Sequence, residues 1–201
     1  MIGVKTKQKS NVGTTIIELL VAMSVFSIFI TIGSQLLAVA LNEHLRASER
    51  AELLNQASYA LEYMNRSLRM ARKDISGNCI AQNLNYDNPG GNNSAVRFVS
   101  YQGKCMEFSS QDVSQAGKVF KVIMVRKSSN GAASGLGGYI PITPVGLSAD
   151  NLYFLLNGQS QSDSSQPSIC LAMRIKGRIA SAAQEIRIQS AVSQRELDVQ
   201  Y

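Results

Sequence analysis

The apolar residues of this 201-residue chain are concentrated near its N-terminus. Residues 19–41 contain no charged side chain. As a helix this run would rise about 34 Å, which is enough to cross the hydrocarbon core of a bilayer. Its serine and threonine hydroxyls can bond to helix carbonyls, so they are tolerated in such a segment. We therefore predict a transmembrane helix over residues 14–41.

A one-sided apolar pattern follows this run directly. Spacings of three and four residues separate the members of one apolar stripe, which are Leu54, Ala57, Leu61, Met64, Leu68, Ala71 and Ile75. This periodicity predicts an amphipathic helix over residues 42–76 that continues the membrane helix and ends near Gly77. A helix of about 60 residues with these two halves is unusual for a plain globular domain.

Beyond Gly77 the chain has short apolar runs separated by polar loops. Residues 85–93, 128–138 and 157–166 are rich in Asn, Gly, Ser or Gln and are expected to form loops, the last two flexible. A hairpin is expected at 102–104. The predicted strands are 95–101, 105–108, 119–126, 139–142, 152–156, 168–175 and 185–190. Without intervening helical patterns, they indicate an antiparallel sheet packed on the amphipathic helix, an α+β fold with residues 77–201 as its β-rich domain.

The charge pattern favours a membrane orientation more than a nucleic-acid partner. Lys5, Lys7 and Lys9 precede the apolar run and are part of the formal charge of +6. They predict a cytoplasmic N-terminus and an extracytoplasmic domain. The remaining positive surplus is small and scattered, which is weak evidence for nucleic acid. The nearest thing to a basic cluster comprises Lys118, Lys121, Arg126 and Lys127 near Phe120, and it is more typical of a solvated strand face.

The chain offers little chemistry for catalysis. It has one histidine, so histidine-based triads and most zinc hydrolase sites lack their parts. We expect no enzyme activity, no cofactor and no metal. The cysteines are Cys79, Cys105 and Cys170, and in an exported domain this odd number predicts one disulfide and one free thiol. Cys79–Cys105 is the favoured pair, and Cys170, in an apolar run, is expected to be a small buried hydrophobe.

One carboxylate, Glu18, lies just inside the apolar run. An ionised side chain in hydrocarbon costs roughly 2.5–3.5 kcal/mol, so a sequence that retains one is expected to use it. A basic leader, Gly13 and then Ile-Glu-Leu-Leu-Val at 17–21 resemble the processing site of type IV pilins and type II secretion pseudopilins. Residues 190–195 also resemble the closing segment of many pilin-like proteins. Members of this family usually carry Phe, Met or Leu where this chain has Thr14.

The resemblance implies a bacterial structural subunit. Residues 1–13 would be a leader that prepilin peptidase removes after Gly13, and the new N-terminus at Thr14 would be methylated. Glu18 would meet the terminal amine of a neighbouring subunit in a filament, either a type IV pilus or a type II secretion pseudopilus. The implied partners are other pilin-like subunits, the peptidase and the assembly platform, first in the inner (cytoplasmic) membrane and then in the extracytoplasmic filament. The exported domain and the lack of a helix break favour a minor subunit.

Three alternatives stay open. Ala38-Val39-Ala40 has the form of a signal peptidase site, although the apolar region before it is longer than the roughly 7–15 residues of a signal h-region. The chain could also be a single-pass membrane-anchored binding domain, with its leader intact or cut at Ala40. A competence-type subunit that captures DNA is the third alternative, and it would require clustered cations with aromatics on one face.

Overall fold

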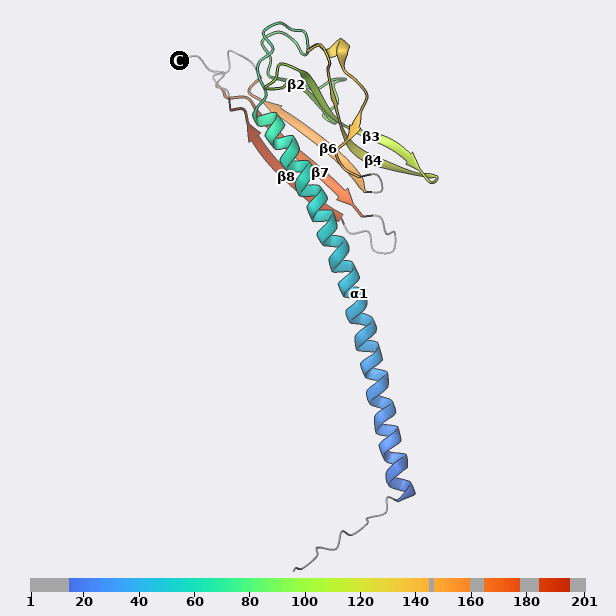
Figure 1. Cartoon of the computed structure of the whole chain (residues 1–201). Helices are drawn as coiled ribbons and strands as arrows, with labels where there is room; N and C mark the ends of the chain where they lie inside the picture. The colour runs from blue at the N-terminus through green and yellow to red at the C-terminus, as the bar shows by residue number, and fades with distance from the viewer. Residues whose placement is uncertain (1–14, 145–146, 160–164, 178–184, 196–201) are drawn as a thin grey trace, which may run out of the picture. The chain divides into compact units, whose positions relative to one another are not determined.

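One long helix and two antiparallel sheets make up the described part of the chain. The computed structural model describes residues 15–144, 147–159, 165–177 and 185–195. Helix α1 covers Ile16–Arg69, and all the strands follow it (Figure 1). The chain divides into two compact units, Met1–Ala47 and Ser48–Tyr201. The predicted α+β class with a long N-terminal apolar helix is confirmed.

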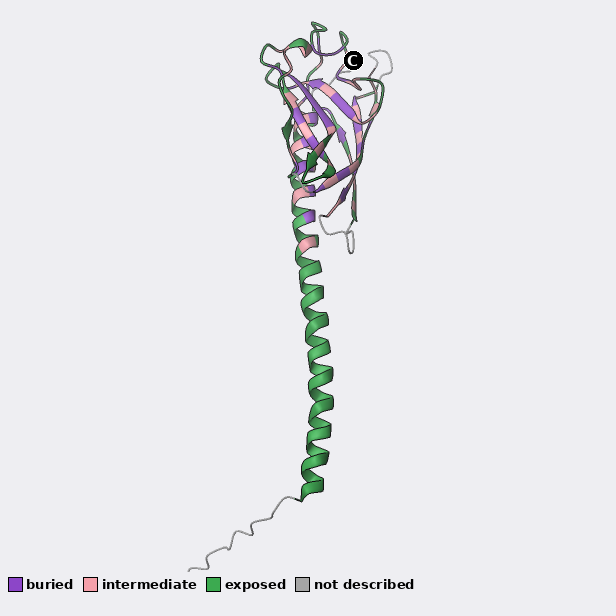
Figure 2. Cartoon of the chain, turned by 90° about the vertical axis from the view of Figure 1, so that its right-hand side faces the viewer, coloured by how far each residue is buried: buried purple, intermediate pink, exposed green. Residues whose placement is uncertain are grey.

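In the first unit, α1 exposes its side chains on every side (Figure 2). The helix is long and apolar enough to span a membrane. Its hydroxyl groups bond within the helix, with Ser24 Oγ 2.6 Å from Leu20 O and Thr31 Oγ1 2.8 Å from Ser27 O. No polar group of these side chains therefore requires a partner outside the helix.

In the second unit, one stripe of α1 is buried. Its buried members are Leu53, Ala57, Ala60, Met64 and Leu68. The predicted stripe was wrong at its two ends, because Leu54 is 46% exposed and Ile75 is 74% exposed.

The predicted end of the helix near Gly77 was also wrong, since α1 ends at Arg69. The backbone beyond it bonds to other segments instead of continuing the helix. Arg72 N donates to Val99 O at 2.8 Å, and Asp74 N donates to Leu84 O at 2.9 Å. Tertiary hydrogen bonds thus override an apolar spacing that still fits a helix.

The first sheet has five antiparallel strands in the order β1-β2-β3-β4-β5. They are β1 (Tyr86–Asp87), β2 (Ala95–Val99), β3 (Cys105–Gln115), β4 (Lys118–Lys127) and β5 (Ile140–Pro141). Strand β3 runs well past the predicted 105–108, because its polar second half pairs with the first half of β4 in a largely exposed ribbon. Such a ribbon needs no apolar alternation. Strand β1 lies within a segment that was predicted to be only a loop.

The second sheet has three antiparallel strands in the order β6-β7-β8. They are β6 (Ser148–Asn157), β7 (Ser168–Lys176) and β8 (Glu185–Ser193). The expectation of a single sheet was therefore wrong. The predicted loop 128–138 contains a 3₁₀ turn, η1 (Ala133–Gly135), and a bridge between Ser128 and Leu136.

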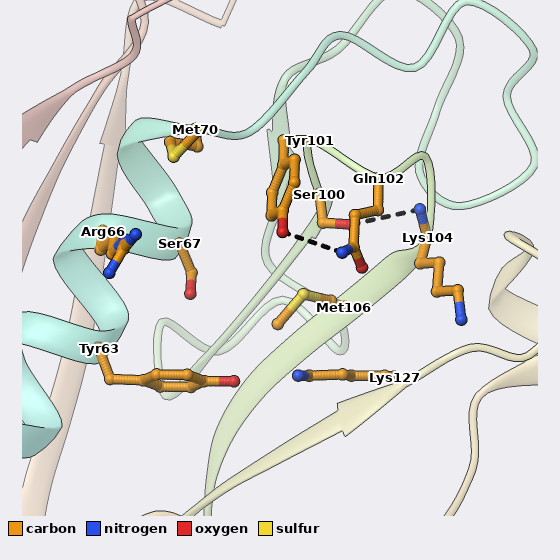
Figure 3. A pocket seen from close by; sticks show the side chains of 10 residues that line it. All are labelled: Tyr63, Arg66, Ser67, Met70, Ser100, Tyr101, Gln102, Lys104, Met106 and Lys127. Atoms are coloured by element: carbon orange, nitrogen blue, oxygen red, sulfur yellow. Dashed lines mark hydrogen bonds between the residues drawn. The ribbon is translucent and has the colours of Figure 1, made fainter.

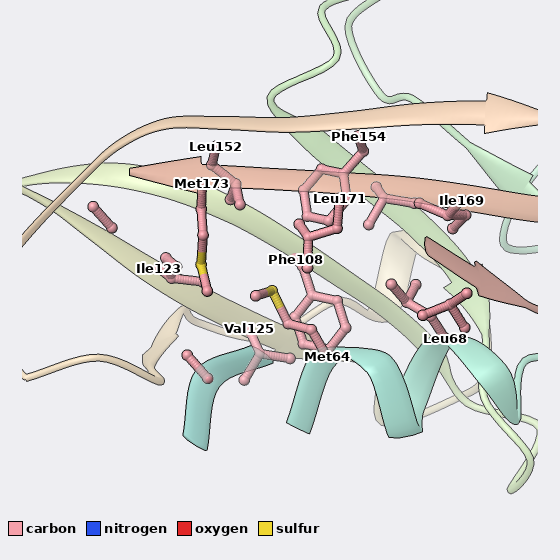
Figure 4. Close-up of a cluster of buried hydrophobic side chains, with 14 of the residues drawn as sticks. Met64, Leu68, Phe108, Ile123, Val125, Leu152, Phe154, Ile169, Leu171 and Met173 are labelled. Atoms are coloured by element: carbon pink, nitrogen blue, oxygen red, sulfur yellow. The ribbon is translucent and has the colours of Figure 1, made fainter. Parts of the chain in front are cut away.

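One hydrophobic core joins α1 to both sheets (Figure 4). Its largest fully buried members include Met64, Leu68, Phe108, Phe154, Ile169 and Leu171. Tyr86 is also buried there, and its hydroxyl donates to Leu68 O at 2.8 Å near the C-terminal end of the helix. Burial raises the pKa of Tyr86, so it stays a neutral donor.

Candidate functional site

The carboxylate of Glu18 lies in the first turn of α1. Thr15 caps this end, because its Oγ1 accepts a hydrogen bond from Glu18 N at 3.4 Å. Glu18 N also donates to the backbone Thr15 O at 3.1 Å. Within the described residues no ion pair or hydrogen bond involves the carboxylate, which is exposed. The predicted processing site, Gly13 and Thr14, lies outside the described residues.

Large apolar side chains surround Glu18 on α1 and continue along the helix. Between residues 16 and 41 the exposed ones are Ile16, Ile17, Leu19, Leu20, Val21, Met23, Val25, Phe26, Ile28, Phe29, Ile30, Ile32, Leu36, Leu37, Val39 and Leu41. Soluble monomers rarely expose so large an apolar surface, and the helix is long and apolar enough to span a membrane. The site therefore combines a carboxylate that has no partner among the described residues with an exposed apolar helix surface.

Cys79 and Cys105 form a disulfide, with their Cα atoms 5.3 Å apart. It links the segment after α1 to the start of β3, and both cysteines are buried beside Ile80. By the chain-entropy model a bridge of this span contributes about 3–4 kcal/mol to the free energy of unfolding. Cys170 is a free thiol on β7, and it is half-buried instead of buried as predicted.

Asp74 organises the loop between α1 and the disulfide. Its Oδ1 accepts hydrogen bonds from the N–H groups of Ser76 and Gly77, and its Oδ2 accepts from those of Cys79 and Ile80, at 2.7–3.1 Å. Burial raises the pKa of this carboxyl, but the hydrogen bonds outweigh burial and hold the pKa below its ordinary value. All of its oxygens are therefore used, and the residue stabilises the loop without offering a site.

Glu107, on β3, is the centre of a buried charge cluster. Arg97 Nη2 on β2 and Arg126 Nη2 on β4 lie 2.7 and 2.8 Å from its oxygens, and the hydroxyl of Tyr139 donates at 2.9 Å. Burial raises the pKa of Glu107, but the two guanidinium groups and the phenol together hold it below its ordinary value. These partners saturate the carboxylate, so we assign the cluster a structural role. No motif in the sequence marks this cluster, because Arg97, Glu107 and Arg126 meet only through the strand register.

The four basic residues of β4 that are close together in the sequence, Lys118, Lys121, Arg126 and Lys127, do not form one surface. Alternation along the strand places Lys121 and Lys127 on one face and Lys118 and Arg126 on the other. Arg126 is bound to Glu107, and Lys121 Nζ lies 3.3 Å from Asp112.

A pocket of about 480 Å³ lies between α1, the turn at 100–104, β3 and β4 (Figure 3). Its lining residues are Tyr63, Arg66, Ser67, Met70, Ser100, Tyr101, Gln102, Lys104, Met106 and Lys127. No sequence pattern marks this pocket, because its residues come from four segments that share no motif. The pocket belongs entirely to the second unit.

Among the described residues, no group of three or more His, Cys, Asp or Glu side chains is placed to hold a metal ion. No protein-family model matches this chain, and no curated protein and no solved structure matches it either. The function must therefore be argued from the residues and their geometry.

Proposed function

We propose that this chain is a prepilin-like structural subunit, which is cleaved and methylated by prepilin peptidase and assembled into a type IV pilus or type II secretion pseudopilus. The observation that carries the proposal is Glu18, which has no partner among the described residues and lies in the first turn of a helix that is apolar on all sides. The resemblance of residues 1–21 to the prepilin processing site supports the same role. In this proposal the chain is a substrate of prepilin peptidase and catalyses no reaction itself.

The physical reason for assembly lies in the charge of Glu18. A carboxylate in hydrocarbon is unfavourable, and an opposite charge at close range stabilises it strongly where water is excluded. Cleavage after Gly13 would create such a charge, the amine of Thr14, on every subunit. Pairing Glu18 of one subunit with the amine of the next neutralises both, whereas a subunit missing at that position leaves one charge buried and unpaired. The same contact would set the axial register of the helices.

The test is assembly by a Glu18→Ala variant in cells that carry the complete machine. We expect the variant to be cleaved like the wild type but to be absent from sheared filaments, or at least strongly depleted. Glu43→Ala is the matched control, because Glu43 is an exposed carboxylate on the same helix whose ion pair with Arg46 at 2.9 Å is worth little. Incorporation of Glu18→Ala at the level of Glu43→Ala would contradict the proposal.

A single-pass membrane-anchored binding domain is the second candidate, and the pocket of Figure 3 favours it. This candidate requires the apolar helix only as an anchor. If it is correct, Glu18→Ala and Glu43→Ala should not differ in the assembly test. The mature chain should then have an intact leader or begin after a cut at Ala40. The two candidates therefore differ in the expected assembly of Glu18→Ala and in the expected N-terminus of the mature chain.

A further inference from the structure

Three basic side chains and no carboxylate line the pocket of Figure 3. Arg66 extends from α1, Lys104 from the turn before β3 and Lys127 from the end of β4, and none of the described residues that line the pocket is Asp or Glu. None of the ion pairs among the described residues involves these three cations. Elsewhere in the second unit, by contrast, Arg97, Arg126 and other basic residues have carboxylate partners.

Apolar and aromatic side chains line the same pocket. Met106 is buried, and Met70 is partly buried. Tyr63 packs edge-on against Phe108 with their ring centroids 5.9 Å apart, and Lys127 Nζ lies 5.9 Å from the centroid of the Tyr63 ring. Tyr101 presents an exposed ring at the rim. A ligand here would meet positive charge and aromatic surface together.

The turn that carries Lys104 is fixed in place. Ser100 N donates to Lys104 O at 2.9 Å, and Lys104 N in turn lies 3.2 Å from Ser100 Oγ. Gly103 supplies the left-handed conformation of the turn, with φ of 73°. The disulfide at Cys105 anchors the next residue. A preformed site loses little conformational entropy when it binds a ligand.

From these observations we propose that the pocket binds a small anion that carries an aromatic or apolar group. The anionic head group, a carboxylate, phosphate or sulfate, would lie among Arg66, Lys104 and Lys127, and the apolar group would lie on Tyr63, Tyr101 and the methionines. The volume of about 480 Å³ is in the range of small-molecule sites. This proposal does not depend on filament assembly, since it concerns only the second unit.

The test is calorimetric titration of the full chain in a neutral detergent with phenyl phosphate. We expect a dissociation constant on the order of 0.1–1 mM, which is normal for a ligand of this size, and weaker binding as salt is added. Inorganic phosphate lacks the ring and benzyl alcohol lacks the charge, so each should bind at least about tenfold more weakly.

The variants are Lys104→Gln with Lys127→Gln, and Arg66→Gln alone. We expect each lost cation to weaken binding about tenfold, because charge-assisted hydrogen bonds are the strong ones. Lys118→Gln, an exposed lysine on β4 outside the pocket, should bind as the wild type does. The proposal is overturned if phenyl phosphate does not bind, if inorganic phosphate binds equally well, or if Lys118→Gln weakens binding as much as the pocket variants.

Discussion

Leu36 and Leu68 lie on the same helix and have opposite surroundings. Leu36 is 66% exposed, whereas Leu68 is 0% exposed in a core shared with both sheets. The second unit thus contains its own hydrophobic core. The described residues of the first unit, 15–47, contribute no buried side chain, so their apolar surface stays exposed.

Glu18 and Glu107 repeat this contrast for charge. Two arginines and a tyrosine surround Glu107, whose side chain is 3% exposed, whereas no described residue pairs with Glu18. A carboxylate is stable when it is hydrated or paired, and the described residues supply no partner for Glu18. The hydrophobic core and the Glu107 cluster therefore both lie in Ser48–Tyr201, whereas the described helix residues before Ser48 leave their side chains exposed.

The largest effect on stability is expected when the charge of Glu107 is removed. Glu107→Gln leaves two partly buried guanidinium groups without their shared anion, which should lower the free energy of unfolding by about 3–5 kcal/mol. Denaturant unfolding of the full chain in mild detergent measures this by tyrosine fluorescence. All seven tyrosines lie at position 59 or later, so the signal reports the second unit alone.

The same variant has a pH signature. The pKa of Glu107 is lower in the folded state than its ordinary value of 4.5. Its contribution to stability is therefore fully present above pH about 4.5 and is lost as pH falls through the folded pKa. Glu107→Gln should lose less stability than the wild type over this acid range, with the remaining loss due to Asp74 and other carboxylates. An unchanged acid profile would show that the cluster is not paired as described.

The next effect compares the two leucines directly. Leu68→Ala removes a fully buried side chain and should cost about 2–5 kcal/mol of unfolding free energy. Leu36→Ala, the same substitution on the same helix, should leave the unfolding of the second unit unchanged within about 0.5 kcal/mol. Equal effects of the two substitutions would mean that residues 16–47 also belong to the folded core.

The smallest effect is a gain in stability at the β3–β4 turn. The two-residue turn between Gln115 and Lys118 has φ of 52° at Ala116 and 74° at Gly117. Such turns favour Asn-Gly, because alanine is strained at positive φ. Ala116→Asn should therefore raise the free energy of unfolding by about 0.5–1 kcal/mol. A loss of stability in the same fluorescence assay would contradict this account of the turn.

Much of the fold could be predicted from the sequence, because local pattern decides it. The uncharged run at 19–41 predicted the apolar helix, and the spacing of Ala57, Met64 and Leu68 predicted its buried stripe. Short apolar runs between polar loops predicted the positions of most strands. The helix end at Arg69 could not be predicted, because backbone pairing with Val99 and Leu84 decides it. The division into two sheets likewise depends on long-range packing.

The candidate sites also differ in whether they could be predicted from local sequence. Glu18 is visible in the sequence because a charge in an apolar run is itself a signal. The Glu107 cluster and the pocket at Lys104 are not visible, since each is assembled from residues on three or more segments.

The most direct test of the central claim is the mass and N-terminal sequence of the mature chain, isolated from cells that contain prepilin peptidase. The account predicts an N-methylated Thr14 as the first residue and predicts that Gly13→Ala retains residues 1–13. A mature chain that still begins at Met1, or that begins after Ala40, would contradict it.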